Sequence, residues 1–315
     1  MYVSRIRVCG LKCFGGPREV DLEVDPEPGW TVLAGPNGSG KSTLLHAVAL
    51  ALGACSATPA SHWLAPGHDD AWAEASPAPR WRLSELAEPP AQARTPLALH
   101  LGGAPVALVP ELLREGILPD GWRVTDPVRH HVARGGLEVP LAELGDGVAA
   151  LAVLVSEVAG RPSGPVLIDD VERHLHPVWQ QRIGSWLTER FPEAQFLVAT
   201  HSPYVCQAAD PGALVHLPAA ESGRPPYRID EAVQQRILYG SGDDAAVSEL
   251  FGLPSSYSPA AEAERRLLVR LERKLYAGLA SDAELAEYRE LGAKLNSSLG
   301  ARADEVAARL LGREP

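Results

Sequence analysis

Apolar and polar positions along the first part of the chain follow the period of strands and then that of a helix. Residues 3–8 and 19–24 place apolar side chains at every second position, with a Gly-Gly-Pro turn between them, and predict two strands. The apolar run 31–34 predicts a third strand. It leads directly into GPNGSGKST and then into LLHAVALALGA, which has the pattern of a helix. A strand, a glycine-rich loop and a helix are therefore expected in immediate succession.

The middle of the chain carries weaker patterns. Residues 56–96 are rich in Ala, Pro, Trp and Ser and show little periodicity. Residues 97–101 and 105–109, separated by a Gly-Gly pair, predict a hairpin, and residues 137–141 predict one more short strand.

The next segment alternates helical and buried-strand patterns. Residues 148–158 are apolar at helical spacing, VLIDD at 166–170 is a buried strand, and 178–191 form an amphipathic pattern. The apolar runs 195–200 and 213–217 predict two further buried strands. Since strands alternate with helices, we expect an α/β fold whose mixed sheet has a parallel core.

The composition changes after ESGRPPYR, which resembles a linker. We therefore expect one domain over residues 1–220 and a C-terminal helical region over 221–315. The leucines at 267, 268, 271 and 275 form one stripe, and Ser281 with Glu284 forms a capping box. A helical hairpin followed by a short helix at 306–311 is expected. Such a region either recruits a partner or only completes the core, and the sequence leaves both open.

Charge and cysteine content narrow the function classes. The formal net charge of −11 disfavours a surface devoted to phosphate backbones, although a local nucleic-acid contact stays possible. Cys9, Cys13, Cys55 and Cys206 lack CxxC spacing and have no downstream pair to complete a zinc site, which favours reduced, mostly buried thiols. No signal peptide is visible and no apolar run approaches the roughly 20 residues of a membrane helix, so a cytoplasmic protein without a membrane partner is expected.

The segment from Gly35 to Thr43 fits the pattern GxxxxGK[ST], placed between a strand and a helix. Its backbone N–H groups and the start of the helix suit the β-phosphate of ATP, and Lys41 suits the β- and γ-phosphates. Ser42 is expected to ligate Mg²⁺. A glycine turn that merely caps a helix explains neither Lys41 nor Ser42. The predicted nucleotide-binding residues are Gly35, Asn37, Gly38, Ser39, Gly40, Lys41, Ser42 and Thr43.

Acidic residues and a histidine follow two of the buried strands. Asp169 is predicted to hold Mg²⁺ together with Ser42, and Asp170 is predicted to face the attacking water. His201, in FLVATHSP, is predicted to contact the γ-phosphate or the water. Without the P-loop, the acids would be a solvated strand end and the histidine a packed surface side chain.

Taken in order, GPNGSGKST, LGDG, LIDDVERHLHP and ATHSP resemble the compact ATPases of the ABC- and SMC-related class. These are AAA-type proteins of the overcoming-lysogenization-defect kind, and the Septu-type and retron-associated phage-defence ATPases are the nearest likeness. The resemblance covers residues 1 to about 217, and HLHP followed by WQQRI is its most specific part. It implies a P-loop NTPase of the ABC-ATPase head type.

The resemblance implies that two heads dimerise and enclose two ATP molecules. Gly145, Asp146 and Gly147, after Leu144, would then contact the γ-phosphate held by the partner. His174 and His176 occupy the turn in which transporter ATPases carry SALD. The family also implies a role in phage defence or DNA repair with a separate effector such as an HNH nuclease, since this chain shows no nuclease constellation of its own.

Three departures from the family pattern bear on the rate of hydrolysis. Gly145 replaces the signature serine and removes a hydroxyl contact to phosphate. Asp170 replaces a glutamate and moves the carboxylate by about 1 Å, a displacement that can cost about 100-fold in rate. Gln92 is the only glutamine between the P-loop helix and the signature, and it lies in EPPAQARTP, a poor strand end for a Q-loop. We therefore expect slow ATP hydrolysis.

Two alternatives remain at this stage. Asp170 and Gly145 favour a sensor that binds ATP without hydrolysing it. The ATP-binding subunit of a membrane transporter fits less well, because HLHP replaces SALD and the Q-loop is missing.

Overall fold

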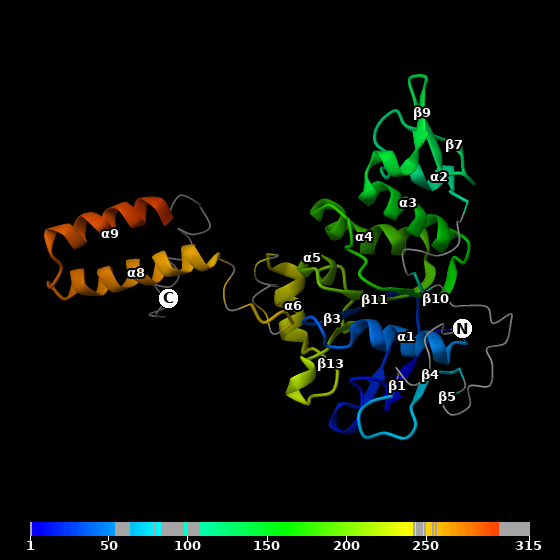
Figure 1. Ribbon diagram of the computed structural model, residues 1–315, viewed down its shortest axis with the longest axis horizontal. Helices are drawn as coiled ribbons and strands as arrows, with labels where there is room; N and C mark the ends of the chain where they lie inside the picture. The colour runs from blue at the N-terminus through cyan, green and yellow to red at the C-terminus, as the bar shows by residue number, and fades with distance from the viewer. Residues whose placement is uncertain are drawn as a thin grey trace. The chain divides into compact units, whose positions relative to one another are not determined.

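The computed structural model describes residues 2–53, 64–78, 80–82, 98–99, 107–241, 243, 248, 250–253, 255 and 257–295. The chain divides into two compact units, Met1–Gly252 and Leu253–Pro315. Figure 1 labels their helices and strands.

A six-stranded sheet with a parallel centre forms the middle of the first unit. Its strand order is β13-β12-β3-β11-β10-β6, and every neighbouring pair is parallel except β12 with β13. This confirms the expected α/β fold and mixed sheet. The strands are β3 (Gly29–Ala34), β6 (Ala98–Leu99), β10 (Ser163–Ile168), β11 (Glu193–Thr200), β12 (Leu214–His216) and β13 (Tyr227–Arg228).

Helices cover both faces of this sheet, which explains why its strands are apolar on both sides. Val32 joins the core beneath α3 (Asp146–Ala159) and α4 (Pro177–Arg190), whereas its neighbour Leu33 joins the core around α1 (Lys41–Ala51). Figure 1 shows α1 on one side of the sheet and α3 with α4 on the other.

A four-stranded antiparallel sheet packs on the outer side of α1, with strand order β2-β1-β4-β5. Ile6 and Val8 point into the shared core while the residues between them are more exposed, as the period-two pattern predicts. The strands are β1 (Arg5–Cys9), β2 (Val20–Glu23), β4 (Trp72–Ser76) and β5 (Trp81–Arg82).

A small three-stranded antiparallel sheet lies between β6 and α3 along the chain. Buried Val132 and Leu141 join it to the core beneath α3. Its strands are β7 (Arg123–Asp126), β8 (His131–Arg134) and β9 (Leu137–Pro140), and the short helix α2 (Pro110–Leu113) precedes them.

The expected hairpin over 97–101 and 105–109 is wrong where the structure describes it. Ala98 and Leu99 form β6, which pairs in parallel with β10, and residues 107–109 are not in a strand. Residues 98–99 pair with β10 because the edge of β10 opposite β11 is available to another strand. Residues 100–106 lie outside the described part of the chain.

The first unit extends beyond residue 220, where the sequence suggested a boundary. Two short helices, α5 (Pro203–Cys206) and α6 (Glu231–Tyr239), close one side of it. Ile237 is buried in the main core, and the Gln234 side chain bonds the backbone of Gly212 and Asp210 at 2.8 and 2.6 Å. These contacts attach α6 to the rest of the first unit.

The described residues of the second unit form the helices α8 (Pro259–Tyr276) and α9 (Asp282–Leu295). Ser258 caps α8 through the N–H of Ala261, and Ser281 forms the expected capping box with Glu284. The predicted short helix at 306–311 lies outside the described residues.

Candidate nucleotide site

The glycine-rich loop between β3 and α1 is held by close approaches that exclude larger residues. A Cβ atom at Gly35 would lie 2.2 Å from the carbonyl oxygen of Leu217. Gly40 has a φ of 102°, and a Cβ there would lie 2.6 Å from both the Cys13 sulfur and a Phe14 ring carbon. The loop is therefore wedged between the segment after β12 and the segment after β1, and its glycines are sterically required.

Lys41 begins α1 and is almost completely buried. Its Nζ donates to the carbonyl oxygens of Gly35 at 2.9 Å and Pro36 at 3.1 Å. Burial lowers the pKa of Lys41 to about 8, against the opposing effect of the Asp170, Glu172 and Asp169 carboxylates. The ammonium group of Lys41 thus lies inside the P-loop, close to the acidic residues that follow β10.

Ser42 and Asp169 meet at the carboxyl ends of the strands. The Ser42 hydroxyl donates to Oδ1 of Asp169 at 3.1 Å, across 127 positions of sequence. A hydroxyl and a carboxylate oxygen at this separation suit Mg²⁺, which prefers oxygen ligands. These two residues fit the metal role that the sequence assigned to them.

His201 follows β11 and contacts Lys41. The Lys41 Nζ donates to His201 Nδ1 at 3.4 Å, so the tautomer consistent with this contact carries its proton on Nε2. Burial, and then the charge of Lys41, lower the pKa of His201 below its usual value. A neutral imidazole with an Nε2–H donor is suited to a phosphate oxygen or to a water molecule.

Comparisons with known proteins agree with this geometry. Residues 5–62 match the family described as "AAA domain", and residues 82–207 match "AAA domain, putative AbiEii toxin, Type IV TA system". The fold resembles the Smc head domain of Pyrococcus furiosus, solved with an extended coiled coil and the C-terminal domain of ScpA. That match has a TM-score of 0.52 and 14% identity, and covers 75% of this chain and 98% of that one. The chain is a P-loop protein whose matched segments are AAA domains, and its fold resembles that of an SMC head domain.

Sequence relatives of this AAA-class head cover only parts of it. The "Retron Vc95 probable ATPase" of Vibrio cholerae serotype O1 biovar El Tor is 41% identical over 87 residues, which are 24% of this chain and 17% of the relative. The "Septu protein PtuA" of Bacillus thuringiensis is 32% identical over 101 residues, 30% of this chain and 24% of the relative. The chain thus matches less than a quarter of each of these relatives' lengths.

Asp170 in this AAA-class head has left-handed backbone geometry, with a φ of 50°. Asp and Asn are among the few non-glycine residues that adopt such angles readily. His174, four residues further on, also has a positive φ of 64°. The turn after β10 is therefore shaped by its backbone, and a shorter acid at position 170 suits that shape.

The signature turn lies at the start of α3. Gly145 has a φ of 107° with open space around its missing Cβ, so a glycine at this position suits the backbone and a serine would be strained. A Cβ on Gly147 would lie 2.4 Å from the carbonyl oxygen of His174. Within the described residues, no hydrogen bond or ion pair joins residues 145–147 to the P-loop of the same chain. They lie against the turn after β10 instead.

Two residues that sequence reasoning missed support the site. Glu172 accepts from the Thr200 hydroxyl at 2.6 Å and from the backbone N–H of His201 at 2.5 Å. Arg18 is buried, and its Nη2 donates to the carbonyl oxygens of Ser39 at 3.0 Å and Pro218 at 2.9 Å. The third acid in LIDDVERHLHP was a visible signal for Glu172, whereas nothing in the sequence pattern singled out Arg18.

The other predicted residues have different exposures. Asn37 and Gly38 are exposed at the loop tip, Thr43 is half-buried, and Ser39 is buried with no hydrogen-bond partner for its hydroxyl among the described residues. Gln92, the Q-loop candidate, lies outside the described residues.

The described part of the chain contains no helix long and apolar enough to cross a membrane.

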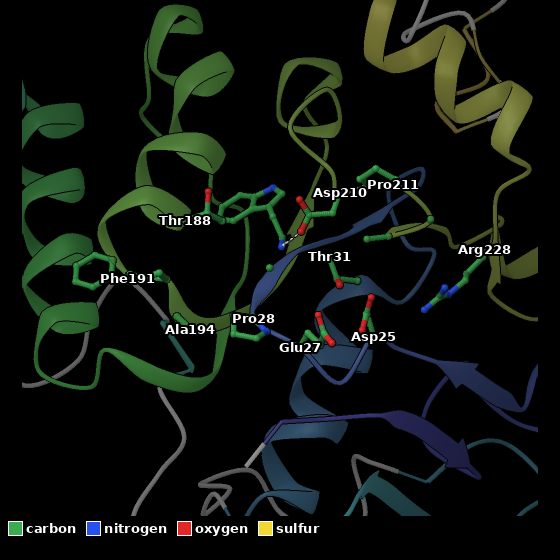
Figure 2. Close-up of a pocket in the computed structure, with 15 residues that line it drawn as sticks. Asp25, Glu27, Pro28, Thr31, Thr188, Phe191, Ala194, Asp210, Pro211 and Arg228 are labelled. Atoms are coloured by element: carbon green, nitrogen blue, oxygen red, sulfur yellow. Dashed lines mark hydrogen bonds between the residues drawn. The ribbon is translucent and has the colours of Figure 1, made fainter.

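A cavity of about 450 Å³ lies at the opposite ends of the central strands and does not include the P-loop. Figure 2 shows Asp25, Glu27, Asp210 and Arg228 around it. Asp210 accepts from the Trp30 N–H at 2.5 Å, which fixes the start of β3. The nucleotide site is therefore identified by its side-chain chemistry and not by the size of a cavity.

Proposed function

We propose that this chain is an ATP-binding and slowly ATP-hydrolysing head that acts in the cytoplasm. The observation that supports this most is the convergence of Lys41, Ser42 with Asp169, and His201 at the carboxyl ends of three parallel strands. In open α/β sheets, ligands bind at this end of the strands. A glycine-rich turn with only a structural role does not need this group of side chains.

Mg²⁺ would be held by Ser42 and Asp169 and would neutralise charge on the β- and γ-phosphates. Lys41 exchanges its bonds to the Gly35 and Pro36 carbonyls for phosphate oxygens. Asp170 orients the attacking water, and His201 donates from Nε2 to the γ-phosphate. Slow turnover follows from the short carboxylate at position 170.

The head is further proposed to dimerise around ATP, with Gly145, Asp146 and Gly147 of one copy facing the γ-phosphate bound by the other. Support comes from the exposed signature turn at the start of a long helix and from the SMC-type fold. A separate effector, such as an HNH nuclease in phage defence, is proposed because segments of this head resemble retron and Septu proteins.

A sensor that binds ATP without hydrolysis is the second candidate, favoured by Asp170 and Gly145, which stand where the family pattern has a glutamate and a serine. The two are separated by single-turnover hydrolysis of labelled ATP, with Lys41→Ala and Asp170→Asn as comparisons. Hydrolysis above the Lys41→Ala background is expected for the wild-type chain and its loss for Asp170→Asn. ATP binding without any turnover above that background would establish the sensor.

A further inference from the structure

Three side chains with metal-binding chemistry converge at one end of the N-terminal antiparallel sheet. The Cys9 sulfur, a Glu19 carboxylate oxygen and a His68 ring nitrogen all lie within 4.8 Å of one another. Cys9 ends β1, Glu19 directly precedes β2, and His68 lies shortly before β4. Because β2, β1 and β4 are neighbours in the sheet, this proximity follows from the strand order and not from sequence spacing.

The contacts of these side chains already orient them toward a common centre. The Cys9 thiol donates to Oε1 of Glu19 at 3.2 Å. His68 Nδ1 lies 3.3 Å from the carbonyl oxygen of Pro66, and donation from Nδ1–H leaves the lone pair of Nε2 available. A histidine that binds a metal through one nitrogen commonly donates its other N–H to a carbonyl in this way.

The imidazole ring of His68 also packs closely against the backbone of Gly15. A Cβ atom at Gly15 would lie 2.5 Å from Cε1 of the ring. Any larger residue at position 15 would displace the imidazole, so the glycine preserves the position of a ring that approaches Cys9 and Glu19.

We propose that Cys9, Glu19 and His68 form a Zn²⁺ site, with water or a partner's side chain as the fourth ligand. A set of one sulfur, one nitrogen and one oxygen suits Zn²⁺, whereas Mg²⁺ and Ca²⁺ prefer oxygen alone. Zinc bonds of about 2.0–2.3 Å require ligand atoms about 3.3–3.8 Å apart. The Cys9 sulfur and the Glu19 oxygen already lie 3.2 Å apart, and the two pairs with His68 lie within 4.8 Å, so those pairs need to close by at most about 1 to 1.5 Å.

A metal at this site would restrain residues 10–18, the segment that packs against the P-loop. Cys9 and Glu19 flank residues 10–18, in which Cys13 and Phe14 lie against Gly40, and Arg18 bonds the carbonyl oxygen of Ser39. A metal bridging the two ends of this segment and His68 restrains it in the folded state. Zinc binding is therefore expected to stabilise the nucleotide-binding half of the head.

The thiol of Cys9 is protonated in the metal-free protein. Burial, and then the hydrogen bond to Glu19, raise its pKa to about 11. Coordination replaces the S–H···O contact with a metal–thiolate bond, so zinc binding releases one proton to the solvent.

The test uses the full chain, stripped of metal with a chelator and kept reduced, and titrated separately with Zn²⁺ and Co²⁺. About one Zn²⁺ per chain should bind and raise the melting temperature. Co²⁺ should give a thiolate charge-transfer band and the d–d bands of a tetrahedral site. Cys9→Ser should abolish the charge-transfer band, and both Cys9→Ser and His68→Ala should weaken Zn²⁺ binding by at least about 10-fold.

Cys13→Ser is the matched control, because Cys13 lies in the same segment but outside the cluster. It should retain the charge-transfer band and the zinc affinity. Glu19→Gln serves as a second ligand variant should Cys9→Ser not fold, as judged by circular dichroism. Absence of zinc binding by the wild-type chain, or a cobalt thiolate band that persists in Cys9→Ser, would overturn the proposal.

Discussion

The carboxylate of Glu172 accepts a hydrogen bond from the backbone N–H of His201 at 2.5 Å, although the residues follow different strands. The same carboxylate accepts from the Thr200 hydroxyl at 2.6 Å. The turn after β10 and the loop after β11 are thus joined directly beside the nucleotide site. Glu172 positions His201 and has no need to contact the nucleotide itself.

Replacing Glu172 should therefore reduce turnover more than nucleotide binding. We expect Glu172→Ala to lower kcat by about 10- to 100-fold with little change in KM, because His201 loses its fixed backbone position. Glu172→Gln, which retains an acceptor oxygen, should lie between this variant and the wild type. Steady-state ATP hydrolysis measures both parameters. Glu189→Gln, on the exposed side of α4, is the control, and an equal effect from it would contradict the positioning role.

Replacing Asp170 by Asn should leave the fold intact but reduce ATP hydrolysis. Asn adopts left-handed backbone angles as readily as Asp, so Asp170→Asn should keep the melting temperature while hydrolysis falls by about 100-fold or more. Asp170→Glu should not act as a faster enzyme, since a longer side chain at a φ of 50° is strained. Single-turnover assays combined with thermal unfolding test both statements. A rate gain in Asp170→Glu would show that side-chain length alone limits turnover.

ATP binding should take up protons in mildly alkaline solution. Lys41 has a pKa of about 8 in the free head, so close to half of it is neutral at pH 8, and an anionic triphosphate favours its charged form. We expect uptake of about half a proton per ATP at pH 8 and almost none at pH 6.5. Affinity should accordingly weaken from pH 7 to pH 9. Calorimetry in buffers of different ionisation enthalpy measures the uptake.

Lys41→Arg provides the control for this proton uptake. Its guanidinium stays charged over the whole pH range, so any residual ATP binding should proceed without proton uptake at pH 8. Uptake of the same size in Lys41→Arg would assign the proton to another group.

Glu157 should destabilise the head at neutral and alkaline pH. It is buried in α3, its Oε2 has no hydrogen-bond partner in the part of the chain that the structure describes, and burial raises its pKa to about 7. The folded state therefore holds a proton that the unfolded state has lost above its ordinary pKa, and stability falls as pH rises from about 4.5 to about 7. Glu157→Gln should raise the free energy of unfolding by about 1–3 kcal/mol at pH 8, and by much less at pH 4.5.

Denaturant unfolding at the two pH values measures this difference. Glu189→Gln again serves as the comparison, because its carboxylate is exposed. Equal stabilisation of Glu157→Gln at both pH values would indicate a packing effect instead of a titration.

Local sequence patterns predicted most of the elements of the first unit. Period-two and helical patterns located β1, β3, α4 and β11, and the P-loop fixed Lys41 and Ser42, because these signals depend on neighbouring residues. At β6 the pattern predicted a strand but placed it in a hairpin, whereas the strand pairs in parallel with β10, which is distant in the sequence. The first compact unit also runs to Gly252, past the boundary expected at residue 220, because contacts with distant elements hold α6 to it.

Several contacts between residues that are distant in the sequence could be found only in the tertiary structure. The Ser42–Asp169 pair was expected from the motifs, but the contact of Glu172 with His201, the support of Ser39 by Arg18, and the grouping of Cys9 with Glu19 and His68 were not. These contacts depend on strand order, which brings together positions that no local pattern connects. The glycine at position 145 and the aspartate at position 170 were interpreted from sequence as departures from the family pattern that slow hydrolysis. Their backbone angles show that each residue also suits the turn it occupies.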